Sequence, residues 1–300
     1  MNKMLLYLII VLILTQYYLA IAGRSKPNSL ISYFKQNIIL ATYDAELRTK
    51  EGRVDVKNLI KVLLDLSANT YNFLIWHNPE HDFEDFIEFC KEANKSGILV
   101  WADIVPPSEP PLPKPYLDNY IAWAKVFAKI SLKYRCLVAF TIDDFEGNLG
   151  KFTRNYVEKM VKEFKRINPN LLFIPTVYGG EQVPGFPTFK QFMEEYGDLI
   201  DGILLPYRNL DSVDHLPTIL KAARKALGER KLLIVEIYAT PTSWHREWPK
   251  LEYLSEAIKI GLAYADGVMI YCLPLKPNTH YDRYLLVKKY FSLWASMRYN

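Results

Sequence analysis

The sequence lacks the residue patterns that mark several common kinds of binding site. Its three cysteines, Cys90, Cys136 and Cys272, are far apart and show no metal-ligand spacing, and their odd number leaves at least one thiol unpaired within the chain. We interpret all three as buried, small apolar residues. The net charge is only +4 and the lysines and arginines are scattered, so no basic tract favours nucleic acid as a partner.

The chain also lacks low-complexity segments and any clear interior boundary. Of its 300 residues, 50% are hydrophobic and 14% are aromatic, which is a globular composition with enough material for a large core. The 21 tyrosines and 6 tryptophans suit such a core, and they also suit surfaces that stack against sugar rings.

The first 22 residues have the pattern of a targeting segment. A charged start is followed by an apolar run from Leu5, and the run ends in the small-residue exit Ala20-Ile21-Ala22. We expect a signal peptide cleaved after Ala22; an uncleaved membrane anchor is the alternative, because the run is almost long enough to span a bilayer. Either predicts a secreted or extracytoplasmic protein, in contact with a membrane only if the anchor is retained. Residues 23–36 are expected to be a linker and lead-in, with the folded part beginning near Ser29.

From residue 37 to residue 300, apolar strands alternate with amphipathic helices. The strands are predicted at 37–43, 71–76, 98–104, 137–142, 171–177, 200–205, 232–237 and 267–272, and the helices at 54–66, 83–96, 116–132, 153–167, 189–196, 216–227, 251–265 and 281–297. Continuous apolar strands are typical of parallel sheets covered on both faces. The pattern predicts a single (β/α)₈ TIM barrel as the catalytic domain. A doubly wound open sheet is the alternative, disfavoured because no glycine-rich fingerprint follows the first strand.

The apolar run 137–142 ends abruptly in two adjacent acids, Asp143 and Asp144. Burying a carboxylate is costly and two neighbouring carboxylates repel each other, so we expect one of them to hold its proton near neutral pH. Two acids with separated pKa values suit general acid–base chemistry. A helix cap or a solvated turn is the alternative interpretation.

A barrel of this kind carries its active site at the C-terminal ends of its strands. The residues at those ends that we select as candidates are Asp44, His77, Asn78, Asp103, Asp143, Asp144, Tyr178, Tyr207, Arg208, Glu236, Tyr238, Trp244 and Tyr271. Side-chain alternation places Asp143 on the same face as Ala139 and Thr141, which we expect to point into the barrel. Glu236 interrupts an apolar run, and a lone buried acid needs a partner or a function.

Acids on the fourth and seventh strands lie across the barrel mouth, where they could flank a glycosidic bond as proton donor and as nucleophile or base. We therefore predict Asp143, Asp144 and Glu236 as catalytic residues and the other candidates as substrate-binding residues. The aromatic candidates could stack on sugar rings, with core packing as the alternative for each of them. Arg208 could hold a carboxylate. The proline-rich loop at 106–113 is expected to form a wall of the cleft.

These residues carry a resemblance to (β/α)₈-barrel glycoside hydrolases. The segment Ala139-Phe140-Thr141-Ile142-Asp143-Asp144-Phe145 resembles the end of strand four in O-GlcNAcase-like enzymes. That resemblance implies substrate-assisted cleavage of N-acetylhexosaminides, in which Asp143 polarises the acetamido group and Asp144 is the general acid/base.

A second resemblance is to the large clan of retaining glycosidases with acids on strands four and seven. There Ile234-Val235-Glu236-Ile237 resembles the nucleophile strand and Asp144 takes the acid/base position, although that clan has Asn-Glu where this chain has Asp-Asp. A poorly characterised glycosidase-like family is a third possibility. Together with the N-terminal apolar run, these resemblances lead us to predict an extracytoplasmic glycoside hydrolase of oligo- or polysaccharides that needs no cofactor and no metal.

Two other functions compete with this prediction. A metal-dependent hydrolase would use His77, Asp103, Asp143 and Asp144 as ligands, but no His-x-His or His-Glu-x-x-His spacing supports it. A non-catalytic carbohydrate-binding barrel would keep the aromatic surface without turnover. The sequence predicts no oligomeric state.

Overall fold

The structure is a computed structural model of the chain, and it describes residues 29–44, 46–276 and 280–296. Its strands are β1 (Ile39–Tyr43), β2 (Thr70–Ile75), β3 (Leu99–Ile104), β4 (Leu137–Ile142), β5 (Leu172–Phe173), β6 (Gly202–Pro206), β7 (Leu232–Tyr238) and β8 (Gly267–Tyr271). They form one parallel sheet in the order β5-β4-β3-β2-β1-β8-β7-β6. This order confirms the predicted (β/α)₈ barrel.

The ring is completed between β5 and β6 by a short contact rather than a full ladder. The Asp201 amide donates to the Phe173 carbonyl at 2.9 Å, and the Leu204 amide donates to the Pro175 carbonyl at 3.0 Å. Strand β5 is much shorter than the predicted 171–177. Pro175 gives the physical reason, because it has no N–H to offer to a ladder.

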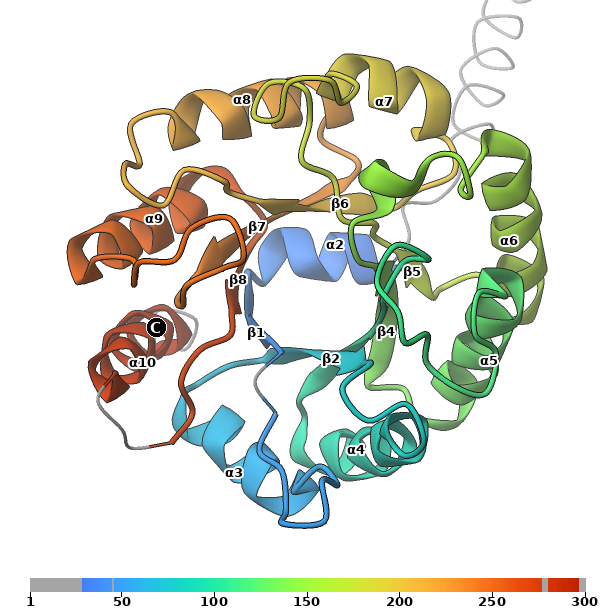
Figure 1. Ribbon diagram of the computed structural model, residues 1–300, viewed down its shortest axis with the longest axis horizontal. Coiled ribbons are helices and arrows are strands. Elements are labelled where there is room, and N and C mark those ends of the chain that lie inside the picture. The colour runs from blue at the N-terminus through green and yellow to red at the C-terminus, as the bar shows by residue number, and fades with distance from the viewer. Residues whose placement is uncertain (1–28, 45, 277–279, 297–300) are drawn as a thin grey trace, which may run out of the picture.

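With one exception at the end of the barrel, the helices surround the strands, as Figure 1 shows in the view along the barrel. They are α2 (Ser29–Gln36), α3 (Val56–Asp65), α4 (Asp82–Ser96), α5 (Tyr120–Lys133), α6 (Arg154–Ile167), α7 (Phe189–Tyr196), α8 (Leu216–Leu227), α9 (Leu251–Tyr264) and α10 (Tyr281–Ser296), with a short 3₁₀ helix η1 (Phe145–Asn148) after β4. The helical spacing read from the sequence explains their burial: α3 turns Val56, Leu59, Ile60 and Leu63 inward. Gly97 ends α4 in a left-handed conformation.

Residues along each strand alternate between two hydrophobic cores. Phe140 and Ile142 of β4 pack in the layer between sheet and helices, whereas Ala139 packs in the core inside the barrel. The same alternation turns Asp143 inward, as predicted.

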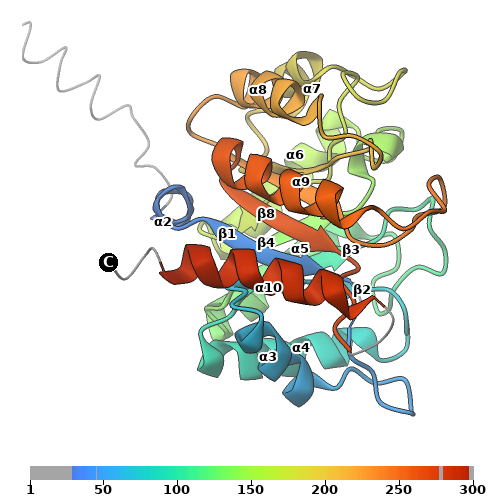
Figure 2. The same ribbon diagram turned by 90° about the vertical axis from the view of Figure 1, so that its left-hand side faces the viewer.

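Helix α2 closes the N-terminal end of the barrel. It lies across the ring in Figure 1 and at the end of the barrel opposite the strand tips in Figure 2. Its Phe34 is buried within the inner core. The expected lead-in at 23–36 thus includes a helix from Ser29 onward, and the opposite, C-terminal end of the barrel is left for a site.

The structure tests the expectations about the cysteines and about the chain ends only in part. Cys90 and Cys136 are buried as predicted, but Cys272 is only half-buried and its thiol lies 3.0 Å from Asp44 Oδ2, so the prediction was wrong for this residue. The targeting segment at 1–22, the linker up to residue 28 and residue 297 of the last predicted helix lie outside the described residues. Within the described ranges, no helix has the length and apolar character needed to cross a membrane.

Candidate active site

A cavity of about 310 Å³ opens at the C-terminal ends of the strands. It is lined by Tyr43, Asp44, Leu74, Trp76, Glu109, Asp143, Asp144, Tyr178, Arg208, Glu236, Tyr238, Thr242, Ser243, Trp244 and Tyr271. The cavity brings together all three residues predicted as catalytic. Of the predicted substrate-binding residues, it includes Asp44, Tyr178, Arg208, Tyr238, Trp244 and Tyr271.

The end of β4 holds the two adjacent acids in different environments. The carboxylate of Asp143 accepts a hydrogen bond from the Tyr43 hydroxyl at 2.7 Å and another from the Asp144 amide at 2.9 Å. Asp144 adopts a left-handed backbone (φ 42°), which Asp tolerates better than most residues, and this turns the chain from β4 into η1. The Tyr178 hydroxyl donates to Asp144 Oδ1. Each acid is therefore held by its own tyrosine.

Asp143 titrates far from its usual range. Burial raises its pKa, the adjacent Asp144 charge raises it further, and the Tyr43 hydrogen bond partly offsets both, which leaves a pKa of about 7. The sequence-based expectation that one member of the pair holds its proton near neutral pH agrees with this environment.

Glu236 points into the barrel from β7 and is only 2% exposed. Burial raises its pKa well above the usual range, and the charges of Asp143 and Asp144 raise it further. Its Oε2 atom is buried and has no hydrogen-bond partner within the described part of the chain. A buried acceptor without a donor is costly unless a ligand supplies one.

Asp103 lies below the cavity instead of lining it. It is completely buried, and the Asn72 side-chain amide donates to its Oδ2 at 2.8 Å. Burial, followed by the Asp143 charge, raises its pKa. Asp103 thus belongs to the polar layer under the site, and its predicted contact with substrate is not supported by its position.

Glu109 is a site residue that the sequence analysis missed. It belongs to the proline-rich loop after β3 and lines the cavity, so this loop does form a wall of the cleft as expected. Burial raises the pKa of Glu109 to about 8, with the charges of Asp143 and Asp144 as the next causes. The signal that could have identified it is its isolation: it is the one charged residue in the run 106–113.

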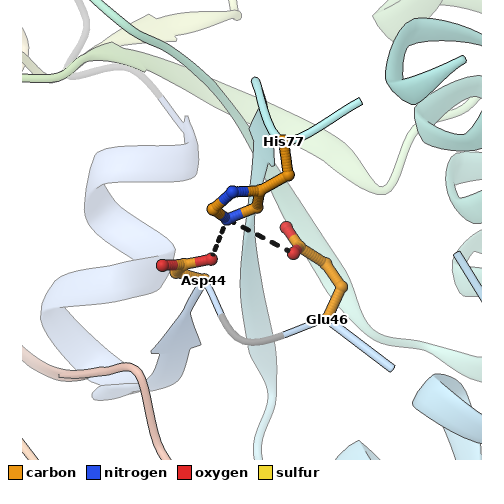
Figure 3. Close-up of side chains that lie close together, drawn as sticks. All are labelled: Asp44, Glu46 and His77. Atoms are coloured by element: carbon orange, nitrogen blue, oxygen red, sulfur yellow. Dashed lines mark hydrogen bonds and ion pairs between the residues drawn. The ribbon is translucent and has the colours of Figure 1, made fainter. Parts of the chain in front are cut away.

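Asp44, Glu46 and His77 form a second group beside the cavity (Figure 3). His77 Nε2 lies 2.5 Å from Asp44 Oδ1 and 3.9 Å from Glu46 Oε2, and the Asp44 hydrogen bond raises the His77 pKa. Burial, then the Asp44 charge, raises the pKa of Glu46 to about 7. Glu46 was not predicted, because the sequence showed no pattern that would pair it with His77.

The ligand atoms of these three side chains lie within 4.8 Å of one another, so they could hold a metal ion. They already have positive partners, however, because Arg48 Nη2 lies 3.6 Å from Glu46 Oε2 and His77 contacts both acids. The predicted ligand set of His77, Asp103, Asp143 and Asp144 is not brought together as such a group among the residues described.

Arg208 is the positively charged residue of the cavity wall. Its guanidinium carbon lies 3.9 Å from the ring centre of Trp244 and 5.3 Å from that of Tyr178. Tyr271 packs against Tyr238 and Tyr43, with ring centres 5.0 and 5.4 Å apart. These rings give the cavity an aromatic wall of the kind that sugar rings contact.

Two predicted substrate-binding residues, Tyr207 and Asn78, do not line this cavity. Tyr207 follows Ile203 and Leu205 on the outer face of β6, and its hydroxyl donates to the Ser212 carbonyl at 2.8 Å. Asn78 lies just before α4, where its backbone N–H donates to Asp82 Oδ2 at 2.8 Å. His77, similarly, reaches the site only through Asp44.

The fold and the cavity define a (β/α)₈ barrel with an acidic, aromatic-walled site at its C-terminal face. No protein-family model matches the sequence, and no curated protein matches it. Among solved structures, a beta-glucuronidase from an uncultured Clostridium is similar at 15% identity and a TM-score of 0.52, over 78% of this chain and 43% of that one.

Two further solved structures are similar. A GH2 beta-galacturonidase from Eisenbergiella tayi has 14% identity and a TM-score of 0.56 over 85% of this chain and 51% of its own. A GH99 endo-alpha-mannosidase from Bacteroides thetaiotaomicron has 14% identity and a TM-score of 0.55 over 82% and 80%. The chain thus spans about half the length of the first two structures. At these identities the likeness shows the barrel fold, and these structural neighbours are glycosidases.

Proposed function

We propose that this chain is a glycoside hydrolase that cleaves oligo- or polysaccharides with Asp144 and Glu236 as its acid pair. The observation that carries the proposal is the meeting of these two acids, from β4 and β7, in one aromatic-lined cavity. Glycoside hydrolysis needs two carboxyl groups that flank the scissile bond. The glycosidases among the structural neighbours support the same class of reaction.

The surroundings of the pair favour Glu236 as the proton donor. Burial and the two neighbouring aspartates raise the pKa of Glu236 well above its usual range, which favours the protonated form that a proton donor needs. Asp144 accepts a hydrogen bond from the Tyr178 hydroxyl, which orients its carboxyl group for the role of nucleophile or base. This reverses the roles that the sequence alone favoured. Asp143 is the neighbour whose charge, after burial, does most to raise the pKa of Glu236.

Substrates with different leaving groups test these roles. A dinitrophenyl glycoside needs no proton donor, so Glu236→Gln should retain most turnover of it while losing about a hundredfold or more on an unactivated linkage. Asp144→Asn should lose both activities. The opposite pattern would restore Asp144 as the donor, and full activity of both variants would remove glycosidase chemistry from this site.

Substrate-assisted cleavage is the second candidate mechanism. The two donors on Asp143, from Tyr43 and the Asp144 amide, fix its carboxylate as polarising an acetamido group would require. In this case Asp143→Asn would be the severe variant, Glu236→Gln would be mild, and only N-acetylated sugars would be cleaved.

The remaining alternatives give different outcomes in the same screen. Binding of an oligosaccharide without turnover would indicate a carbohydrate-binding barrel. Loss of activity on chelation, with recovery after metal addition, would indicate a metal at Asp44, Glu46 and His77. The names of two structural neighbours imply that those proteins act on uronic acids. In this cavity the carboxylate of a uronic acid could pair only with Arg208, and it would lie among several other carboxyl groups.

We also propose that the protein acts outside the cytoplasm, because of its N-terminal apolar run. Mature protein from its host should then begin near Gly23. An intact mass that includes Met1, with tight membrane association, would indicate an anchor instead.

A further inference from the structure

We infer that the substrate carries a positively charged amino group, as an unacetylated amino sugar does, and that Glu109, Asp143 and Asp144 receive it. This inference rests on the proposed glycosidase function and deepens it by naming the charge of the sugar.

The wall of the cavity carries far more acid than base. Five carboxyl groups line it, from Asp44, Glu109, Asp143, Asp144 and Glu236, against the single guanidinium of Arg208. Arg208 is stacked on Trp244 and lies over Tyr178, so its faces are already in use. A neutral sugar supplies no positive charge to these carboxyl groups, and an anionic sugar would add to the negative charge among them.

Within the described part of the chain, four of these carboxyl groups lack a cationic partner. Asp44 is paired with His77 at 2.5 Å, whereas the structure shows no ion pair for Glu109, Asp143, Asp144 or Glu236. A buried acid is ordinarily paired, protonated or bound to a ligand. Glu236 is buried and Glu109, Asp143 and Asp144 are half-buried, so a positive charge placed among them would stabilise their carboxylates.

A second observation points to a ligand that donates hydrogen bonds. Glu236 is 2% exposed and lines the cavity, and its buried Oε2 has no partner among the described residues. A sugar in the cavity can supply that donor. An ammonium group offers three donors and no acceptor, so it can serve several carboxylates at once.

The crowded acids predict what such a ligand does on binding. The pKa of Asp143 is raised to about 7 and that of Glu109 to about 8, so the free protein holds protons in the cavity near neutral pH. An ammonium group that enters the cluster lowers these pKa values and expels protons. A neutral sugar gives no such charge compensation. A free ammonium also has no acyl oxygen, so the inference selects the Asp144–Glu236 mechanism over substrate assistance.

Matched ligands test the inference by binding. Oligosaccharides of glucosamine and of galactosamine, in both anomeric linkages, would be compared with their N-acetylated forms and with the neutral oligosaccharides that carry a hydroxyl group instead. Calorimetry with full-length Glu236→Gln protein, in buffers of different ionisation enthalpy, reports both affinity and proton release. We expect an amino form to bind at least about tenfold more tightly than its neutral counterpart, to release protons and to weaken with added salt.

A pair of variants locates the contact. Glu109→Gln keeps the side-chain shape and should reduce the preference for the amino form about tenfold. Glu80→Gln is the control, because Glu80 is exposed, pairs with Lys114 at 2.6 Å and does not line the cavity. The control should keep the full preference.

Turnover by the wild-type protein on the same panel separates the two proposals. Cleavage of neutral or N-acetylated sugars without an amino preference would overturn the inference and leave the glycosidase function standing. Binding of amino sugars without cleavage would support cation recognition and overturn the glycosidase function. Failure to bind any amino sugar would overturn the inference.

Discussion

Replacing Asp143 by asparagine should make the protein more stable while it harms activity. The ordinary pKa of this carboxyl group is 3.8, and the folded protein raises it to about 7. A difference of roughly three units, at 1.36 kcal/mol per unit, corresponds to about 4 kcal/mol of destabilisation at neutral pH. Asp143 is half-buried and faces the cavity, so solvent screening reduces this figure.

The substitution also has a cost. Asp143 accepts from the Tyr43 hydroxyl and from the Asp144 amide, and asparagine has one carbonyl oxygen for these two donors. Losing one of them costs about 1–2 kcal/mol. We expect a net gain of roughly 1–2 kcal/mol at pH 7, or about 2–6 °C in Tm.

The pH dependence separates charge from packing. Because the pKa of Asp143 is raised in the folded protein, the group contributes nothing below about pH 4, destabilises increasingly up to about pH 7, and has a constant effect above that. The gain of Asp143→Asn should therefore be present at pH 7 and absent at pH 4. Urea unfolding at both pH values measures it.

Asp118→Asn is the matched control, since Asp118 pairs with Lys151 and that partner lowers its pKa. It should give no gain at pH 7. An absence of gain in Asp143→Asn at pH 7, or a gain of equal size at pH 4, would refute the reasoning.

Three other predictions concern different parts of the molecule. Tyr43→Phe removes the hydrogen bond that lowers the Asp143 pKa, so Asp143 should titrate at higher pH in carbon-13 NMR; an unchanged titration would contradict this. Asp266→Ala leaves Lys35 and Arg224 without their shared carboxylate at the N-terminal end of the barrel. It should lower the free energy of unfolding in urea by about 2–4 kcal/mol and leave kcat unchanged. A large loss of kcat in fully folded protein would contradict this prediction. Shortening the loop 106–113 should raise KM more than it lowers Tm, because its Glu109 lines the cavity; the reverse result would make the loop a structural brace.

The sequence predicts the barrel well because its signals are local and repeated. Apolar strands and amphipathic helices alternate along the chain, and tertiary packing preserves that alternation. Strand β5 departs from it at Pro175, where one residue without an amide hydrogen shortens a ladder that hydropathy alone extends. The closing helix α2 escaped prediction because its eight residues lie beside the presumed linker.

Prediction of the site depended on side-chain alternation. It worked for Asp143 and Glu236, whose inward positions follow from period two along β4 and β7. The same rule, applied to β6, would have placed Tyr207 on the outer face with Ile203 and Leu205. Glu109 and Glu46 could not be found this way, because they lie on loops whose paths depend on tertiary contacts.

The strongest argument for a functional cavity comes from the other acids of the same chain. Asp266, Asp201 and Asp82 are each paired with a lysine or an arginine at 2.9 Å or less. Buried Glu146 has no such partner, but two backbone amides donate to its Oε2 at 2.8 Å. At the cavity, by contrast, Glu109, Asp143, Asp144 and Glu236 gather with no ion pair to any of the described residues. Elsewhere in this chain such acids are paired or hydrogen-bonded, so unpaired carboxyl groups in one cavity carry a free-energy penalty. A bound substrate is the best candidate for the group that removes this penalty.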